Sequence, residues 1–176
     1  MTERVLVVGG TGPTGVPIVN RFLDDGAEVA ILHSGAHEAT FAGPEGDTVE
    51  HIHGDARDRD AIPQLLGDRE WDIAICTSGR LRSLADHIAG KTKRLVGITG
   101  QPVYAGAMRR TPEGVLAQPV PEHAQRQRDA SNYTGRVAAG EDQLFEQHAA
   151  ATSRRWWCAI PGSSARGRRS HTSGRW

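Results

Sequence analysis

The sequence is poor in cysteine, and its charges balance. Only two of its 176 residues are cysteines, Cys76 and Cys158, and no Cys-x-x-Cys spacing occurs. We therefore expect free thiols in a reducing cytoplasm and predict no metal site. Lys plus Arg and Asp plus Glu each number 21, so the chain carries no net field that would favour nucleic acid or a membrane.

Two further absences exclude classes of protein. No apolar run approaches the length needed to span a bilayer. The N-terminus shows no succession of basic, apolar and small residues of the kind found in signal peptides. The length leaves room for one domain with a sizeable core, but hardly for two. The sequence thus predicts one cytoplasmic domain that does not bind membranes.

The most informative motif is a glycine-rich turn that directly follows the first apolar segment. Residues 5–8 read as a buried strand and residues 16–23 as a helix, and glycines stand between them at positions 9, 12 and 15. In such a unit the first glycine permits a tight turn, and the second lets the backbone approach a pyrophosphate. The third lets the helix pack against the strand. The motif predicts dinucleotide binding, with a plain tight turn as the alternative.

Strand and helix patterns alternate along the rest of the chain. We expect strands at 28–32, 48–52, 71–76 and 95–99, and helices at 58–66, 80–89 and 131–151, the last with Ser131 as N-cap. Residues 100–129 contain four prolines and predict a long loop. This order favours an α/β fold, a Rossmann-like doubly wound parallel sheet truncated after about five strands, in a domain over residues 1–151.

Other motifs follow the later strands: Gly54-Asp-Ala-Arg-Asp58, Thr77-Ser-Gly79, Val103-Tyr104 and Tyr133-Thr-Gly-Arg-Val-Ala-Ala-Gly-Glu141. With them, over about residues 3–150, the chain resembles the extended or atypical short-chain dehydrogenase/reductase superfamily, in the NAD-dependent epimerase/dehydratase family. The resemblance implies an oxidoreductase that uses NADP or NAD on a sugar-nucleotide-like or other small hydroxylated substrate. A homodimer is a further expectation from similar proteins.

By position, the resemblance assigns cofactor binding to Gly9, Thr11, Gly12, Pro13, Thr14, Gly15, His33, Ser34, Asp55, Ala56, Thr77, Ser78 and Gly79. Asp55, with the backbone of Ala56, would meet the adenine edge, unless Asp55 only caps a helix or shapes a turn. Thr77, Ser78 and Gly79 would line the nicotinamide ribose. The alternative for Thr77 and Ser78 is hydrogen bonding within a turn.

The end of the second strand bears on the choice between NAD and NADP. An acidic residue there would hold the ribose hydroxyls, whereas a basic one would accept a 2′-phosphate. The sequence has His33-Ser34-Gly35 and no acid before Glu38, which slightly favours NADP, since His33 and Ser34 can donate to a phosphate. No arginine stands beside them, and His33 could equally be a solvated strand-end residue.

The catalytic positions depart from the family pattern. The resemblance gives Tyr133 the role of acid/base, but Val137 stands where the family has lysine, and Gly100 falls at its serine. Arg136 could supply the missing positive charge, although arginine is the poorer proton-relay partner, and Thr99 could supply the hydroxyl. A structural role for Tyr133 is the alternative, and a non-catalytic NAD(P)-sensing regulatory protein is the alternative function.

The tail, 152–176, holds six arginines, three of the four tryptophans and no acidic residue. A nucleic-acid or membrane-surface arm would have such a composition, but we favour another hypothesis. Residues 151–161 can be encoded so that the neighbouring frame spells Asp-Phe-Glu-Ala-Met-Val-Val-Arg-Tyr-Pro, which looks like the sixth strand of the family. The tail would then be irregular and out of frame, and the C-terminal substrate-binding part would be missing.

Overall fold

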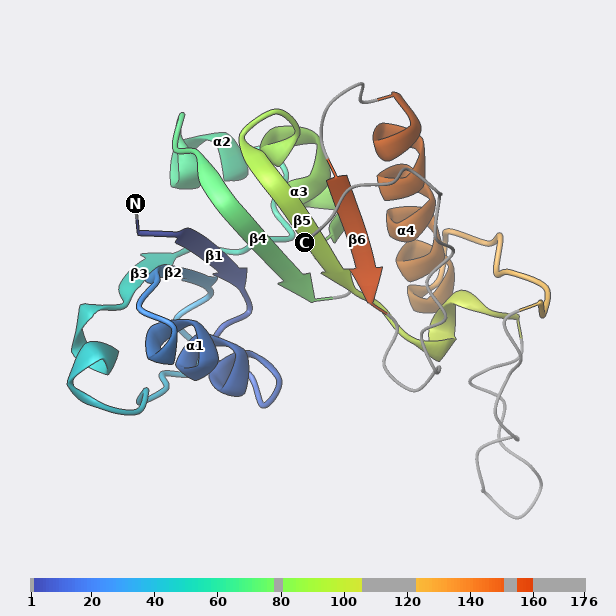
Figure 1. Ribbon diagram of the computed structural model, residues 1–176. Helices are drawn as coiled ribbons and strands as arrows, with labels where there is room; N and C mark the ends of the chain where they lie inside the picture. Colours follow the sequence, from blue (N-terminus) through green and yellow to red (C-terminus); the bar gives the residue numbers. More distant parts are fainter. Residues whose placement is uncertain (1, 78–80, 106–122, 151–154, 160–176) are drawn as a thin grey trace, which may run out of the picture.

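The computed structural model describes residues 2–77, 81–105, 123–150 and 155–159 (Figure 1). Six parallel strands form one sheet in the order β3-β2-β1-β4-β5-β6. The strands are β1 (Arg4–Val8), β2 (Glu28–His33), β3 (Glu50–His53), β4 (Trp71–Thr77), β5 (Thr92–Ile98) and β6 (Arg155–Ala159). The helices are α1 (Gly15–Asp24), α2 (Ile62–Leu66), α3 (Leu81–Ile88) and α4 (Tyr133–Ala150), with short 3-10 turns η1 (Pro44–Thr48) and η2 (Gln101–Val103).

Alternate residues of the strands supply two separate cores, one on each face of the sheet. Val5 and Val7 of β1 pack with Val19 and Leu23 of α1. Leu6 and Val8 point to the opposite face, whose cluster includes residues of α2, α3 and α4. Since side chains along a strand alternate between faces, a strand that is apolar throughout must be covered on both sides. The sequence expectation of a doubly wound parallel sheet is confirmed (Figure 1).

Several boundaries differ from those expected. The helix expected from residue 58 begins only at Ile62, because Oδ1 of Asp58 accepts the backbone N–H groups of Asp60 and Ala61 and holds a turn before it. In the same way, Ser131 is not the N-cap of α4. Oδ1 of Asn132 accepts the backbone N–H of Gly135 at 2.8 Å instead.

The sheet has a sixth strand that the expected irregular tail does not include. β6 pairs in parallel with β5, from Arg94 opposite Arg155 to Ile98 opposite Ala159. The Trp-Trp-Cys-Ala run within it is rich in residues that suit strands, whereas the sequence had led us to expect an irregular tail read from a shifted frame. The remainder of the tail lies outside the described residues.

The strand order reverses direction between β1 and β4, because the chain winds outward from β1 to β3 and then returns to β4. Open parallel sheets bind ligands beyond the carboxyl ends of the strands at such a point. The glycine-rich turn lies at the carboxyl end of β1. Within the parts of the chain that the structure describes, no helix is long and apolar enough to cross a membrane.

Candidate functional site

Three positions of the turn between β1 and α1 require glycine: Gly9, Gly15, and Gly10, where a Cβ would lie 2.5 Å from Cγ2 of Ile31. Gly9 has a φ of 87°, in the left-handed region that side chains disfavour, and its N–H donates to the carbonyl of Leu32 at 2.9 Å. A Cβ on Gly15 would lie 2.3 Å from the carbonyl oxygen of Gly9. Only glycine therefore allows α1 to begin so close to the turn.

Gly12 is different, because the packing of the turn does not require it. A Cβ there would touch only the carbonyl oxygen of Gly9, at 3.5 Å, which is ordinary contact. The N-cap of α1, Thr14, makes no side-chain capping bond, and the first turn of the helix has no acidic residue. No side chain therefore compensates the partial positive charge at the start of α1, which borders the same pocket as Gly12.

That pocket has a volume of about 450 Å³, in the range of small-molecule sites. We call it the glycine pocket. It brings together eight residues that the sequence analysis assigned to the cofactor, and adds His37. The lining consists of Gly9, Thr11, Gly12, Pro13, Thr14, Gly15, His33, Ser34 and His37.

His33, at the end of β2, is only 5% exposed, so it is not a solvated strand-end residue. Burial lowers the pKa of its imidazole below the usual value, and the charge of Glu38 opposes that shift. Glu38, the first acid after β2, lies 3.5 Å from ring nitrogens of both His51 and His53. Among the residues that line the glycine pocket there is no carboxylate.

The other expected cofactor residues lie apart from that lining. Oδ1 of Asp55 accepts both the backbone N–H and the Nε–H of Arg57, at 2.9 and 3.0 Å, which are the contacts of a turn. Ala56 is buried in the core. Thr77 ends β4, where it pairs with Ile98, while Ser78 and Gly79 fall outside the described residues.

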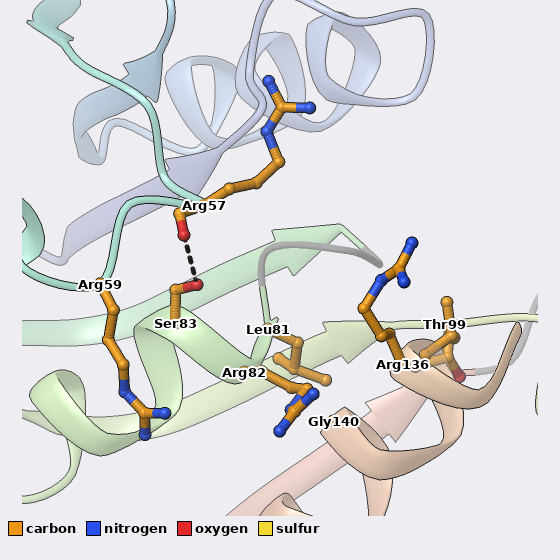
Figure 2. Close-up of a pocket in the computed structure, with 9 residues that line it drawn as sticks. Arg57, Arg59, Leu81, Arg82, Ser83, Thr99, Arg136 and Gly140 are labelled. Atoms are coloured by element: carbon orange, nitrogen blue, oxygen red, sulfur yellow. Dashed lines mark hydrogen bonds between the residues drawn. The ribbon is translucent and has the colours of Figure 1, made fainter. Parts of the chain in front are cut away.

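A second pocket, of about 350 Å³, is lined by arginines from three segments (Figure 2). Arg57 and Arg59 follow β3, Arg82 belongs to α3 and Arg136 to α4. We call it the arginine pocket. The full lining is Arg57, Arg59, Leu81, Arg82, Ser83, Thr99, Arg136, Val137 and Gly140.

Two of these arginines already have acidic partners. Arg59 pairs with Asp86, and hydrogen bonding with Asp55 raises the pKa of the Arg57 guanidinium above its usual value. Ser83 donates to the carbonyl of Arg57 at 3.1 Å and fixes the backbone at that wall (Figure 2). The lining nevertheless holds four arginines and no carboxylate, so the pocket is suited to an anionic group.

Thr99, expected to replace the catalytic serine, is buried beside a carboxylate. Its Oγ1 donates to Oε1 of Glu141 at 3.0 Å, and Glu141 is only 1% exposed. Arg126 pairs with Glu141 and also with Asp142, the latter at 2.7 Å. Burial of Arg126 lowers the pKa of its guanidinium, but its two acidic partners outweigh that effect and raise the pKa overall. These contacts join the end of β5 to α4.

The expected catalytic residues on α4 differ in their surroundings. Tyr133 is the first residue of the helix and is 50% exposed. Arg136 lines the arginine pocket together with Thr99, and its Nη1 donates to the carbonyl of Ser131 at 2.7 Å. Val137, at the lysine position, is buried at 3% exposure and contributes to the same wall.

No motif in the sequence pointed to Arg59, Arg82 or Ser83 as site residues, or to the pairing of Arg126 with Glu141. Arg59 and Arg82 are 23 positions apart, and no local motif contains both. The packing of α3 and α4 beside each other brings Arg82 and Arg136 together, and the bond from Ser83 to the carbonyl of Arg57 adds the segment after β3. His37, by contrast, lies four residues after His33, close enough for the same motif to have suggested it.

The fold is shared with solved structures of several enzymes. The Bordetella bronchiseptica enzyme WbmH, in complex with NAD+, matches with a TM-score of 0.67 and 16% identity over 91% of this chain and 56% of its own. Vestitone reductase from alfalfa (Medicago sativa) matches with a TM-score of 0.66 and 15% identity, over 90% of this chain and 56% of its own. For dTDP-glucose 4,6-dehydratase from Bacillus anthracis, in complex with NAD, the TM-score is 0.60 and the identity 14%, over 90% of this chain and 54% of its own.

The chain has the Rossmann-like fold of these enzymes. The resemblance inferred from the motifs is therefore confirmed at the level of fold. The chain spans about half the length of the solved structures it matches. No protein-family model matches the sequence, and a comparison with curated proteins finds no match.

Proposed function

We propose that the chain is the dinucleotide-binding part of an epimerase/dehydratase-type oxidoreductase. The observation that carries the proposal is the glycine pocket, which Gly12 lines although a Cβ there would meet only the carbonyl oxygen of Gly9, at 3.5 Å. Backbone amides of the turn and of the first turn of α1 would hold the diphosphate. When bound, the nicotinamide would supply a hydride donor or acceptor.

For the adenosine half, the pocket wall favours NADP slightly. His33, Ser34 and His37 line it, and this lining has no carboxylate to repel a 2′-phosphate. Asp55 and Ala56 would meet the adenine, and Thr77, Ser78 and Gly79 the nicotinamide ribose. Asp55 would have to do so while it keeps its contacts with Arg57.

For the substrate, we propose a sugar-nucleotide-like or other small hydroxylated compound whose anionic part lies in the arginine pocket. WbmG of Bordetella bronchiseptica, of similar fold at 16% identity, was solved with NAD and UDP. Tyr133 would exchange the proton and Arg136 would stabilise the charge that develops beside it. Thr99 would act on a substrate oxygen only after its hydroxyl turns away from Glu141.

Titration of the full chain with NAD+ and NADP+ separately tests the cofactor proposal. We expect saturable binding, tighter for NADP+, and at least about tenfold weaker binding by Gly12→Ala because its methyl group enters the diphosphate cradle. Thermal unfolding of Gly12→Ala should match the parent, since the added Cβ meets no close neighbour. Failure of the folded protein to bind either dinucleotide at millimolar concentration would falsify the proposal.

A non-catalytic NAD(P) sensor is the second candidate, and the buried Val137 at the lysine position favours it. An assay of NADPH and NADH oxidation with a panel of keto-sugars distinguishes the two functions. Turnover that Tyr133→Phe abolishes supports the enzyme. Tight dinucleotide binding without turnover on any sugar supports the sensor.

Three expectations from the sequence also enter the proposal. We propose a cytoplasmic location, a possible homodimer, and a tail read from a shifted frame that no longer encodes the substrate-binding part. Sequencing the locus tests the last point. An intact reading frame, with no family-like continuation in the neighbouring frame, would exclude the shifted-frame hypothesis.

We also expect that the tail does not bind nucleic acid. A salt titration of the full chain with nucleic acid tests this, because binding through the arginines of the tail would weaken as the salt concentration rises.

A further inference from the structure

Three histidines and a glutamate converge beside the glycine pocket, at the carboxyl ends of β2 and β3. His33 ends β2, His51 and His53 lie on β3, and Glu38 lies on the connection between these strands. We call these four residues the histidine cluster. His51 and His53 are two positions apart on one strand, so their side chains share a face. His53 is also the direct partner of His33 across the ladder.

Three of the distances between donor atoms are close to the edge length of a tetrahedral metal site. Nε2 of His33 lies 3.1 Å from Nδ1 of His51. The Glu38 carboxylate oxygens lie 3.5 Å from Nδ1 of His51 and 3.5 Å from Nε2 of His53. One ligand atom from each of the four residues falls within 4.8 Å of all the others. A tetrahedron with metal–nitrogen bonds of about 2.0–2.1 Å has edges of about 3.3 Å.

The cluster also holds its ligands in place. His33 is almost fully buried, so its ring has little freedom. The ring of His51 lies against Phe41, with centroids 6.1 Å apart. When Nε2 of His33 binds a metal, its ring proton moves to Nδ1, which must then give up the hydrogen bond that it accepts from the backbone N–H of Gly35 at 3.3 Å. The backbone at His37 is a second hydrogen-bond partner of this ring and can accept a bond from Nδ1–H, an outer contact typical of metal-ligating histidines.

We propose that His33, Glu38, His51 and His53 bind one divalent transition-metal ion of the zinc class. Three imidazoles and a carboxylate form a donor set that zinc accepts in proteins. With all four positions filled by the protein, the site is structural. The bound ion links β3 and the segment after β2 to His33, which ends β2 and lines the glycine pocket. From the sequence we expected no metal site; the four ligands come from three segments, and no recognised spacing joins them.

The test uses the full chain without a histidine affinity tag, freed of metal with EDTA. We expect calorimetric titration with Zn2+ to give one site per chain, and Co2+ to give the visible absorption of a tetrahedral complex. His51→Gln and His53→Gln should each weaken Zn2+ binding at least about tenfold. Losing a residue that only hydrogen-bonds to a ligand already costs about that much affinity, so losing a ligand itself should cost no less. His148→Gln, a change on an exposed residue of α4, is the matched control and should bind as the parent does.

Folding is followed separately, by circular dichroism and thermal unfolding of every variant without metal. The side chain of His53 is 58% exposed, so its replacement disturbs the core least and keeps the test interpretable. Zinc should raise the unfolding temperature of the parent and of His148→Gln, but not of His53→Gln. Absence of stoichiometric binding at millimolar Zn2+, or equal affinity in the parent and both cluster variants, overturns the proposal.

Discussion

Gly12 and Gly15 lie three residues apart in one turn, yet the turn uses them in different ways. Gly15 is needed by the protein, since its missing side chain lets α1 approach the carbonyl of Gly9. At Gly12 the protein has room for a methyl group. A glycine that internal packing does not require is the stronger indication of a ligand, because something other than the fold must account for it.

Gly15→Ala is predicted to destabilise the chain. Its Cβ would lie 2.3 Å from Gly9 O and 2.6 Å from the Gly10 backbone, so α1 or the turn must shift. We expect the free energy of unfolding to fall by about 1–3 kcal/mol, as for other overpacked sites, measured by urea denaturation. Gly12→Ala is the control and should unfold at the parental urea concentration. Equal stability of the two variants would show that the close approach is not required.

At the scale of elements, α4 is held to the sheet by a buried carboxylate rather than by apolar packing alone. Glu141 faces Thr99 at the end of β5 and Arg126, whose backbone forms an isolated bridge with Tyr104. A buried charge costs several kcal/mol unless it is paired. The same contacts therefore position α4, which carries Tyr133 and Arg136.

Arg126→Met is predicted to destabilise the chain by about 3 kcal/mol, because it removes a cation that pairs with the buried carboxylate of Glu141. Arg128→Met, which removes an exposed cation two positions along, is the control and should change little. Chemical denaturation of both variants measures the difference. If Arg126→Met is no more disruptive than Arg128→Met, the ion pair does not hold α4 in place.

For the whole molecule, β6 decides where the sheet ends. It covers the edge of β5 along five paired residues, Arg155–Ala159. An uncovered strand edge offers free backbone groups to another chain and promotes self-association. The short strand therefore has a role of its own, whatever the origin of the tail that contains it.

A chain shortened to residues 1–150 is predicted to unfold at a lower temperature and to self-associate, because it loses β6. A chain of residues 1–161 keeps β6 and serves as the control. Light scattering after gel filtration, with thermal unfolding, compares the two. A monomeric 1–150 chain as stable as the 1–161 chain would contradict this role for β6.

The sequence by itself determined the parallel α/β fold and the glycine turn, since apolar strands, helix periods and glycine spacing are local signals read within a few residues. It missed the cap at Asn132, the strand at 155–159 and the burial of His33. Only tertiary structure decided the arginine pocket and the histidine cluster. Their members are brought together from separate segments by the sheet order and by the packing of α3 and α4, and no local pattern in the sequence encodes such distances.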